Sequence, residues 1–369
     1  MNSRLRGPSS DGLRIFKYQA LGNSYLVLDP LLNRDLMKSF EKTSGGNALP
    51  PARLVRWLCN QTYGVGSNGL LLGPVAIEGA KHFGLHIINS DGSYAEFSGN
   101  GIRIFAKYLL DAGYASPNAP TLVQTLLDEP AHEIRLIPIE FEDREHLAIK
   151  VALPFQPRFG ADAVGANSAG VLRLSDGHSY TVRGLAELGA RLTGAADAWI
   201  SSTLSDVGNP HCTTFVANRD FLPTRQQLTA ADDGFRAIAF RPARPDGPTA
   251  FRRGANLQWV YVLDRKAVEV VIYERGEGPT SASGSSACAA ACAAFLRGLV
   301  GPTVDVRMPG GLLRINIRSD AGRIAAVWLV GNANRVFDAH IDAADVAESE
   351  GRENLRQTHD RSVSRAYPF

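Results

Sequence analysis

The sequence predicts an α/β (α+β) protein built from two similar domains. Its 369 residues exceed the roughly 100–200 residues of one ordinary domain. Each half contains a Gly-Asn turn, then strand-like stretches, then a Ser-Gly step that opens an apolar helix. The spacing is nearly equal, because 75 positions separate Asn23 from Ser98 and 74 separate Asn209 from Ser283. Several elements recurring in one order indicate an internal duplication, whereas a single shared glycine-rich turn would indicate chance.

Local patterns define the elements of the first half. Apolar alternation predicts strands over 14–19 and 25–29, joined by a turn that contains Gly22 and Asn23. Apolar residues at helical spacing predict a helix over 102–110 with one buried face. The other expected elements are a helix near 52–60 and strands over 70–72, 82–89 and, in alternation, 121–153.

The second half repeats this plan. A turn at 208–211 precedes a strand over 212–216, and an Ala- and Cys-rich helix over 287–296 suits an enclosed position. The stretch 220–253 is rich in Arg, Pro and Asp, which favours an inserted surface loop. Further strands are expected over 256–263, 267–273, 305–308, 312–317, 323–330 and 336–341.

These elements suggest the domain boundaries. The polar N-terminus lacks the apolar segment of a signal peptide, and the charged C-terminus has little to anchor it. The expected parts are a flexible leader over 1–12, an N-terminal domain over 13–154, a C-terminal domain over 155–330 with the insert 220–253, a closing strand over 331–343 that returns to the N-terminal domain, and a loose tail over 344–369.

Composition narrows the class of protein. The net charge of +2 gives no electrostatic reason to expect nucleic acid or an acidic membrane surface as a partner. No apolar run reaches the roughly 18 residues of a membrane span. Four cysteines, Cys59, Cys212, Cys288 and Cys292, are too few for a disulfide scaffold. We therefore expect a cytoplasmic protein.

Two serines open the two apolar helices. The N-terminus of a helix leaves backbone N–H groups unpaired and carries a partial positive charge. If the halves face each other, the helices that begin after Ser98 and Ser283 point into one cleft and can hold a carboxylate. Local sequence alone favours a simpler role, because serine is among the preferred N-cap residues.

Two longer motifs resemble the signatures of diaminopimelate epimerases. Residues 89–103 read Asn-Ser-Asp-Gly-Ser-Tyr-Ala-Glu-Phe-Ser-Gly-Asn-Gly-Ile-Arg, and residues 274–288 read Glu-Arg-Gly-Glu-Gly-Pro-Thr-Ser-Ala-Ser-Gly-Ser-Ser-Ala-Cys. The resemblance spans most of 14–342. It implies two similar domains, each a β-barrel-like sheet around a central helix, with the site between them and neither pyridoxal phosphate nor a metal. Motifs in family order also include Phe16-Lys17, 22–23, 64–66, 208–211, Asn256 and the strand 331–341.

The resemblance implies proton exchange at an amino-acid Cα, carried out in the family by two cysteines. Here the two positions are Ser98 and Ser283. A thiol has a pKa of about 8.5, whereas that of an alcohol lies far higher. A helix dipole is worth about 0.3–2 kcal/mol, at about 1.36 kcal/mol per pKa unit, so it cannot close the gap. His211 and Glu274 are therefore candidate substitute bases, although the family uses these positions to support the site.

The resemblance also places a binding shell. The guanidinium of Arg275 can grip a carboxylate as a fork, and Glu274 can pair with an ammonium group. These residues also have alternative roles that involve no substrate. The asparagines can serve turn geometry, and residues 274–275 can form a solvated charge pair. The implied contacts to the non-reacting end of the substrate are Asn89, Asn256, Glu274 and Arg275. Those to the reacting carboxylate are the backbone N–H groups of Gly99, Asn100, Gly284 and Ser285, and Asn23 and Asn209 line the cleft.

We thus expect an isomerase without a cofactor that acts at Cα of a small-molecule substrate, a zwitterionic, diaminopimelate-like amino acid, and that can be a homodimer. Ser24 and Asn68 stand where aspartate is common, and Ser286 replaces a usual glycine, so the substrate stays open. Three alternatives remain. The chain can be a lyase or other isomerase acting on a related amino acid. It can be a binding protein that has lost the thiols. The serines can also be engineered replacements that trap a complex.

Overall fold

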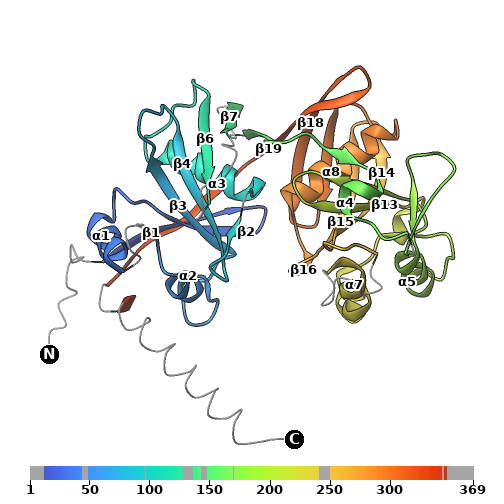
Figure 1. The fold of residues 1–369 in the computed structure, drawn as a ribbon, viewed down its shortest axis with the longest axis horizontal. Helices are drawn as coiled ribbons and strands as arrows, with labels where there is room; N and C mark the ends of the chain where they lie inside the picture. Colours follow the sequence, from blue (N-terminus) through green and yellow to red (C-terminus); the bar gives the residue numbers. More distant parts are fainter. Residues whose placement is uncertain are drawn as a thin grey trace, which may run out of the picture. The chain divides into compact units, whose positions relative to one another are not determined.

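The computed structural model describes residues 12–43, 49–95, 97–127, 136–142, 148–168, 170–240, 250–342 and 345–346. Most of the expected leader and tail lie outside these residues. The chain forms two units, which Figure 1 shows as ribbons. Unit 1 comprises residues 1–138 and 333–369, and unit 2 comprises residues 139–332.

Unit 1 is a mixed sheet that packs on one central helix. Its strands are β1 (Leu13–Ala20), β2 (Asn23–Leu28), β3 (Gly69–Ala76), β4 (Phe83–Asn89), β5 (Tyr94–Ala95), β6 (Thr121–Leu126) and β20 (Asn334–Ile341), and its helices are α1 (Arg34–Thr43), α2 (Ala52–Cys59) and α3 (Gly99–Asp111). Helix α3 lies against β1, β2, β3 and β20. Apolar residues of α3 such as Ile102, Phe105 and Leu109 are fully buried, which makes it the centre of the unit.

Unit 2 wraps its strands around the second serine-capped helix. Helix α8 (Gly284–Leu296) contacts strands on all sides, and its alanines and cysteines are buried because only small side chains fit so closely to a surrounding sheet. The strands are β8 (Ala148–Ala152), β9 (Arg158–Phe159), β10 (Val171–Arg173), β11 (Tyr180–Val182), β12 (Ser202–Asp206), β13 (Pro210–Phe215), β14 (Asn256–Asp264), β15 (Ala267–Glu274), β16 (Gly278–Thr280), β17 (Thr303–Met308), β18 (Gly311–Asp320) and β19 (Arg323–Gly331). The other helices are α4 (Ala161–Val164), α5 (Arg183–Thr193), α6 (Arg225–Ala230) and α7 (Asp232–Ala239).

The strand pairing contains the duplication that the sequence predicts. In unit 1, β2 runs parallel to β3, and β3 runs antiparallel to β4. In unit 2, β13, β14 and β15 repeat this arrangement. The matching rows of paired residues are Leu26–Leu70–Ile88 and Cys212–Leu257–Tyr273. In both units the capping serine lies ten positions beyond the last residue of the row.

The division between the units differs from the expected boundary at 154/155. Strand β8 pairs with β19, where Ala152 lies opposite Trp328, and β7 (Leu136–Glu142) pairs with β8. These hydrogen bonds place residues 139–154 in unit 2. Strand β20 pairs with β1 in unit 1, as Leu13 opposite Ile341 shows.

The expected surface loop over 220–253 is wrong for much of its length. Helices α6 and α7 occupy it, and the part at 241–249 lies outside the described residues. Phe235 is fully buried, with its ring centroid 6.1, 5.5 and 5.3 Å from those of Trp199, Trp259 and Tyr273. The charged composition concealed the helical spacing of its apolar residues, and burial of these rings is what fixes α7 to the core.

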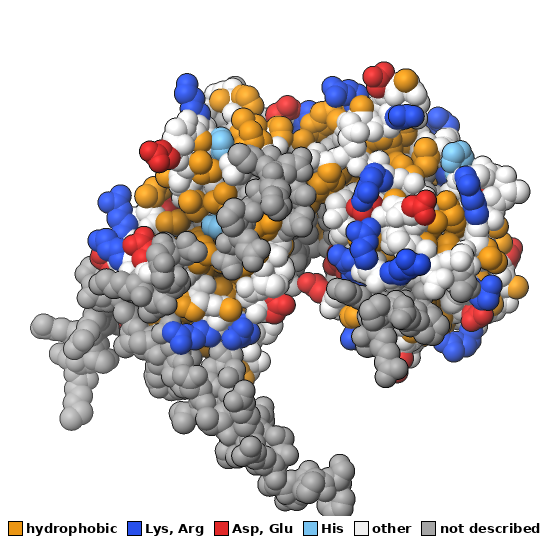
Figure 2. All heavy atoms as spheres, in the orientation of Figure 1, with side chains coloured by type: hydrophobic (Ala, Val, Ile, Leu, Met, Phe, Trp, Pro, Cys, Tyr) orange, Lys and Arg blue, Asp and Glu red, His pale blue; other side chains and the backbone are white. Residues whose placement is uncertain are grey.

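The surface and the helices fit the composition. On the face shown in Figure 2, acidic and basic side chains are interspersed with apolar ones, in keeping with a net charge of +2. No helix in the described part of the chain is long and apolar enough to cross a membrane.

Replacing Phe235 with alanine tests whether α7 belongs to the core. We expect Phe235→Ala to lower the free energy of unfolding by about 3–5 kcal/mol, because it leaves a cavity among three aromatic rings. Leu172→Ala, at a side chain that is 48% exposed, should change it by no more than about 0.5 kcal/mol. Urea denaturation measures both. Equal, small effects would mean that α7 packs loosely on the surface.

Candidate active-site residues

Unit 1 contributes the capped end of α3. Ser98 has an extended backbone, with φ −143° and ψ 112°, and its Oγ accepts a hydrogen bond of 3.0 Å from the Gly101 N–H. Ser98 is half-buried, whereas Gly99 and Asn100 behind it are buried. The first N–H groups of such a helix have no partner within the helix, so this end can hold a carboxylate.

A tyrosine that the sequence argument missed stands beside this serine. The hydroxyl of Tyr25, on β2, lies 3.2 Å from Ser98 Oγ. The side chain is otherwise enclosed, since the residue is only 6% exposed. The duplication contained the signal that could have found it, because Tyr25 and His211 each lie two positions beyond a repeated asparagine.

Unit 2 contributes the capped end of α8. Ser283 also has an extended backbone, and its Oγ accepts a 3.4 Å hydrogen bond from the Ser286 N–H. The hydroxyl of Ser285 lies 3.4 Å from the same Oγ. Ser283 is 6% exposed and Ser286 is fully buried, so this half-site is more enclosed than that of unit 1.

Glu274, at the end of β15, carries the carboxyl beside Ser283. Its partial burial, and then the negative charge of Glu277, raise the pKa of its carboxyl to about 7. The hydroxyls of Ser283 and Thr280 act on this pKa in the opposite direction. A carboxyl that titrates near neutral pH beside a serine hydroxyl is suited to general-base work.

The hydrogen bonds and the burial of His211 do not suit the role of a base that the sequence suggested. The amide of Gln258 donates to His211 Nδ1 over 2.8 Å and to Ser286 Oγ over 3.1 Å, while its carbonyl oxygen accepts from Thr213 over 3.2 Å. Because Nδ1 accepts, Nε2 carries the hydrogen and donates to Asn209 Oδ1 over 2.7 Å. Complete burial lowers the pKa of His211 to about 3. His211 is therefore neutral and orients Asn209.

Arg275 is fixed in place by its neighbours. Its backbone N–H donates to Asn256 Oδ1 over 2.9 Å, and its guanidinium donates to the carbonyl oxygen of Arg253 over 2.9 Å. Asp206, which is 5% exposed, binds Arg158 and Arg253 close by. A half-buried guanidinium held in this way keeps donors for a substrate carboxylate.

The predicted residues fall into the two units as follows. Asn89 donates to Ser93 Oγ over 2.9 Å, so at least part of its amide serves the turn. Unit 1 holds Asn23, Asn89, Ser98, Gly99 and Asn100, and unit 2 holds Asn209, His211, Asn256, Glu274, Arg275, Ser283, Gly284 and Ser285.

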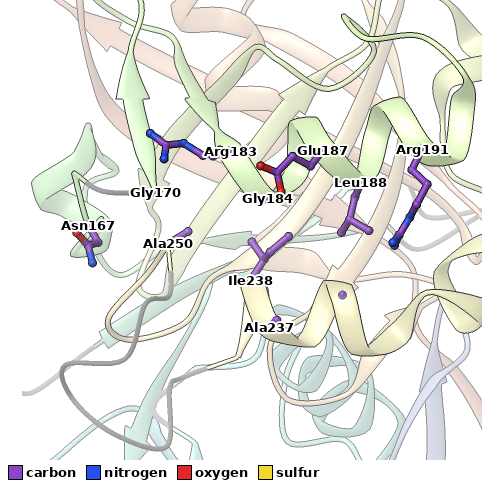
Figure 3. A pocket seen from close by; sticks show the side chains of 11 residues that line it. Asn167, Gly170, Arg183, Gly184, Glu187, Leu188, Arg191, Ala237, Ile238 and Ala250 are labelled. Atoms are coloured by element: carbon purple, nitrogen blue, oxygen red, sulfur yellow. The ribbon is translucent and has the colours of Figure 1, made fainter.

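A pocket of about 470 Å³ lies elsewhere in unit 2, between α5 and α7. Figure 3 shows Glu187, Leu188 and Arg191 along α5 and Ile238 on α7. None of the predicted site residues lines this pocket, which therefore does not belong to the serine-capped half-site.

Comparison with known proteins identifies related chains. The family model for diaminopimelate epimerase matches residues 203–336. Diaminopimelate epimerase from Desulforudis audaxviator is 31% identical over 324 residues, covering 87% of this chain and 96% of that one. The enzyme of the same name from Desulfitobacterium hafniense is 30% identical over 327 residues, covering 88% and 96%.

Solved structures share the fold at low sequence identity. A phenazine biosynthesis protein of the PhzF family from Bacillus anthracis has a TM-score of 0.55 and 13% identity, covering 89% of this chain and 99% of that one. A hydroxyproline epimerase from Agrobacterium vitis has a TM-score of 0.52 and 14% identity, covering 91% and 94%.

The protonation state of His211 can be tested through the pH dependence of stability. Its pKa is about 3 in the folded chain and 6.5 in the unfolded one. Between these values the unfolded chain binds a proton that the folded chain does not, so stability falls as the pH drops below 6.5. We expect His211→Gln to reduce this slope by about 1.4 kcal/mol per pH unit. Urea denaturation from pH 3.5 to 8 measures it, and an unchanged slope would contradict a neutral His211.

Proposed function

We propose that this chain, which belongs to the diaminopimelate epimerase family and is an isomerase, exchanges the proton at Cα of a zwitterionic amino acid that carries a second carboxylate. Glu274 beside Ser283, at the N-terminus of α8, is the observation that supports this most. The carboxyl titrates near pH 7 and the helix end is ready for an anion. These are the two requirements of proton abstraction next to a carboxylate.

The proposed steps in unit 2 involve Ser283 and Glu274. The Cα–H bond breaks and its electron pair is delocalised into the substrate carboxylate. The proton passes to Ser283 Oγ while the hydroxyl proton of Ser283 passes to Glu274. Backbone N–H groups of Gly284 and Ser285, which have no partner within the helix, stabilise the charge that develops on the carboxylate oxygens.

Glu274 is needed because serine cannot do what a thiol does. Ionising an alcohol at neutral pH is far too costly for the N-terminus of a helix to offset. Relay to a carboxylate whose pKa is near 7 avoids an alkoxide, since the hydroxyl gains one proton as it loses another. Proton transfer of this kind contributes about 10²–10⁴-fold to a rate.

The proposed substrate follows from the charges of the half-site. Arg275 is oriented by Asn256 and by the Arg253 carbonyl, so its guanidinium is prepared for the carboxylate at the far end of the substrate. The side-chain carbonyl oxygen of Asn209 accepts a hydrogen bond from His211, so the N–H groups of the same amide can donate to the substrate. An amino acid with two carboxylates satisfies both the helix end and Arg275.

Exchange in D₂O tests the function. Diaminopimelate, glutamate and aspartate are incubated with the protein, and loss of the Cα–H signal is followed by NMR. We expect exchange with at least one of them, increasing with pH around a midpoint near 7 as Glu274 loses its proton. Glu274→Gln should lower the rate by about 10²–10⁴-fold. The matched Glu277→Gln should shift the midpoint downward, because it removes the charge that raises the pKa of Glu274.

Other outcomes of this experiment would favour other functions. Loss of a substrate group would indicate a lyase, and binding without exchange would indicate a binding protein. Exchange that persists in Glu274→Gln would contradict the role of this carboxyl.

Introducing thiols at the two serine positions tests whether the alcohols limit the reaction. We expect the double variant Ser98→Cys/Ser283→Cys to epimerise diaminopimelate at least about tenfold faster than the natural chain, because a thiol pKa of about 8.5 falls readily at a helix N-terminus. Optical rotation measures the rate. A natural chain that turns over diaminopimelate at an ordinary ~1–10³ s⁻¹ would show that serine needs no such help.

A further inference from the structure

We propose that Tyr25 supplies and reclaims the proton that Ser98 exchanges with the substrate, so that the two half-sites use different acid–base groups. This inference rests on the proposed function and assigns the proton source in unit 1. It starts from the contact of 3.2 Å between the Tyr25 hydroxyl and Ser98 Oγ.

The ring of Tyr25 is held where its hydroxyl must meet the serine. Gly69, at the start of β3, leaves the space for it, because a Cβ atom there would lie 2.7 Å from the ring carbon Cε1. Tyr25 lies on β2, two residues after Asn23. At the start of the same strand the Ser24 N–H donates a hydrogen bond to Asn68 Oδ1. The ring is therefore packed on one side by backbone and directed toward the N-terminus of α3.

The exposed fractions of the two residues show which hydroxyl a substrate can reach. Tyr25 is 6% exposed, whereas Ser98 is half-buried and more open. A substrate can therefore touch Ser98, and Tyr25 acts through it. Ser98 Oγ already accepts the Gly101 N–H, which fixes the oxygen while its proton exchanges with the phenol.

The proton step balances without any other reagent. A carbanionic Cα takes the proton of Ser98, Ser98 takes the proton of Tyr25, and the phenol becomes a phenolate. The positive end of α3 and the Gly101 N–H lie beside the oxygens that share this charge. In the reverse direction each of the three bonds is restored.

The duplication shows why unit 1 needs a phenol. Tyr25 holds the position that His211 holds in unit 2, and Asn89 holds that of Glu274. Unit 1 thus lacks a carboxyl at the end of its matching strand, and the phenol contacts the serine. A phenol with an ordinary pKa of about 10 is protonated at neutral pH, and tyrosine is an established general acid–base residue. Glu274 and Tyr25 are therefore complementary, one a base and the other an acid.

Tyr25→Phe is the direct test, because it removes only the hydroxyl and keeps the ring against Gly69. Inversion and Cα–H exchange in D₂O are measured separately for both stereoisomers of the substrate. We expect inversion to fall by about 10²-fold or more, while exchange of one isomer without inversion continues through Glu274. Ser98→Ala should have the same effect. Tyr63→Phe, at a ring that is 64% exposed, is the control and should invert at the natural rate.

The split between exchange and inversion separates proton supply from mere packing, because a packing role would lower both together. Natural inversion in Tyr25→Phe, or equal loss of exchange and inversion in a folded variant, would overturn the role of Tyr25 alone. Absence of exchange in the natural chain with every substrate would overturn the proposed function, and this role with it.

Discussion

The hydrogen bonds that cap α3 and α8 constrain everything else in the half-sites. Ser98 and Ser283 each accept an N–H from the third residue beyond them, so the position of each hydroxyl is set by helix geometry. A serine fixed in this way remains at the positive end of a helix and close to the anion that the end attracts. It cannot be an anion itself, so a neighbouring group must carry the proton.

The packing of both units keeps these caps in place. Helix α8 is almost entirely Ala, Cys and Ser along its buried face, and strands surround it at close range. A helix so enclosed cannot rotate without clashes, and its first turn is further tied by the Gln258 bonds to Ser286 and His211. In unit 1 the burial of α3 against four strands does the same for Ser98.

The sequence predicted the parts of the molecule that depend on local patterns. The duplication, the serine caps and most strands follow from spacing and from helix-start chemistry. Helices α1, α5 and α7 were not predicted, because charged residues are interspersed among the apolar residues that recur at helical spacing, such as Leu185 and Leu188 in α5. The spacing of the repeated asparagines could have singled out Tyr25, but the contacts of Tyr25 with Ser98 and of Gln258 with His211 join side chains distant in sequence and follow only from the structure.

The duplicated plan also explains how an asymmetric pair of half-sites can arise. Two thiols can each serve as acid or base, so a symmetric pair works in either direction. Alcohols lack this property, and each takes its character from its neighbour. In unit 2 the matching positions hold Glu274 and a neutral His211, whose two ring nitrogens both form hydrogen bonds. In unit 1 they hold Asn89 and Tyr25. In the proposed mechanism the acid–base groups therefore lie on the strands beside the helix caps, where the matching positions of the two units differ.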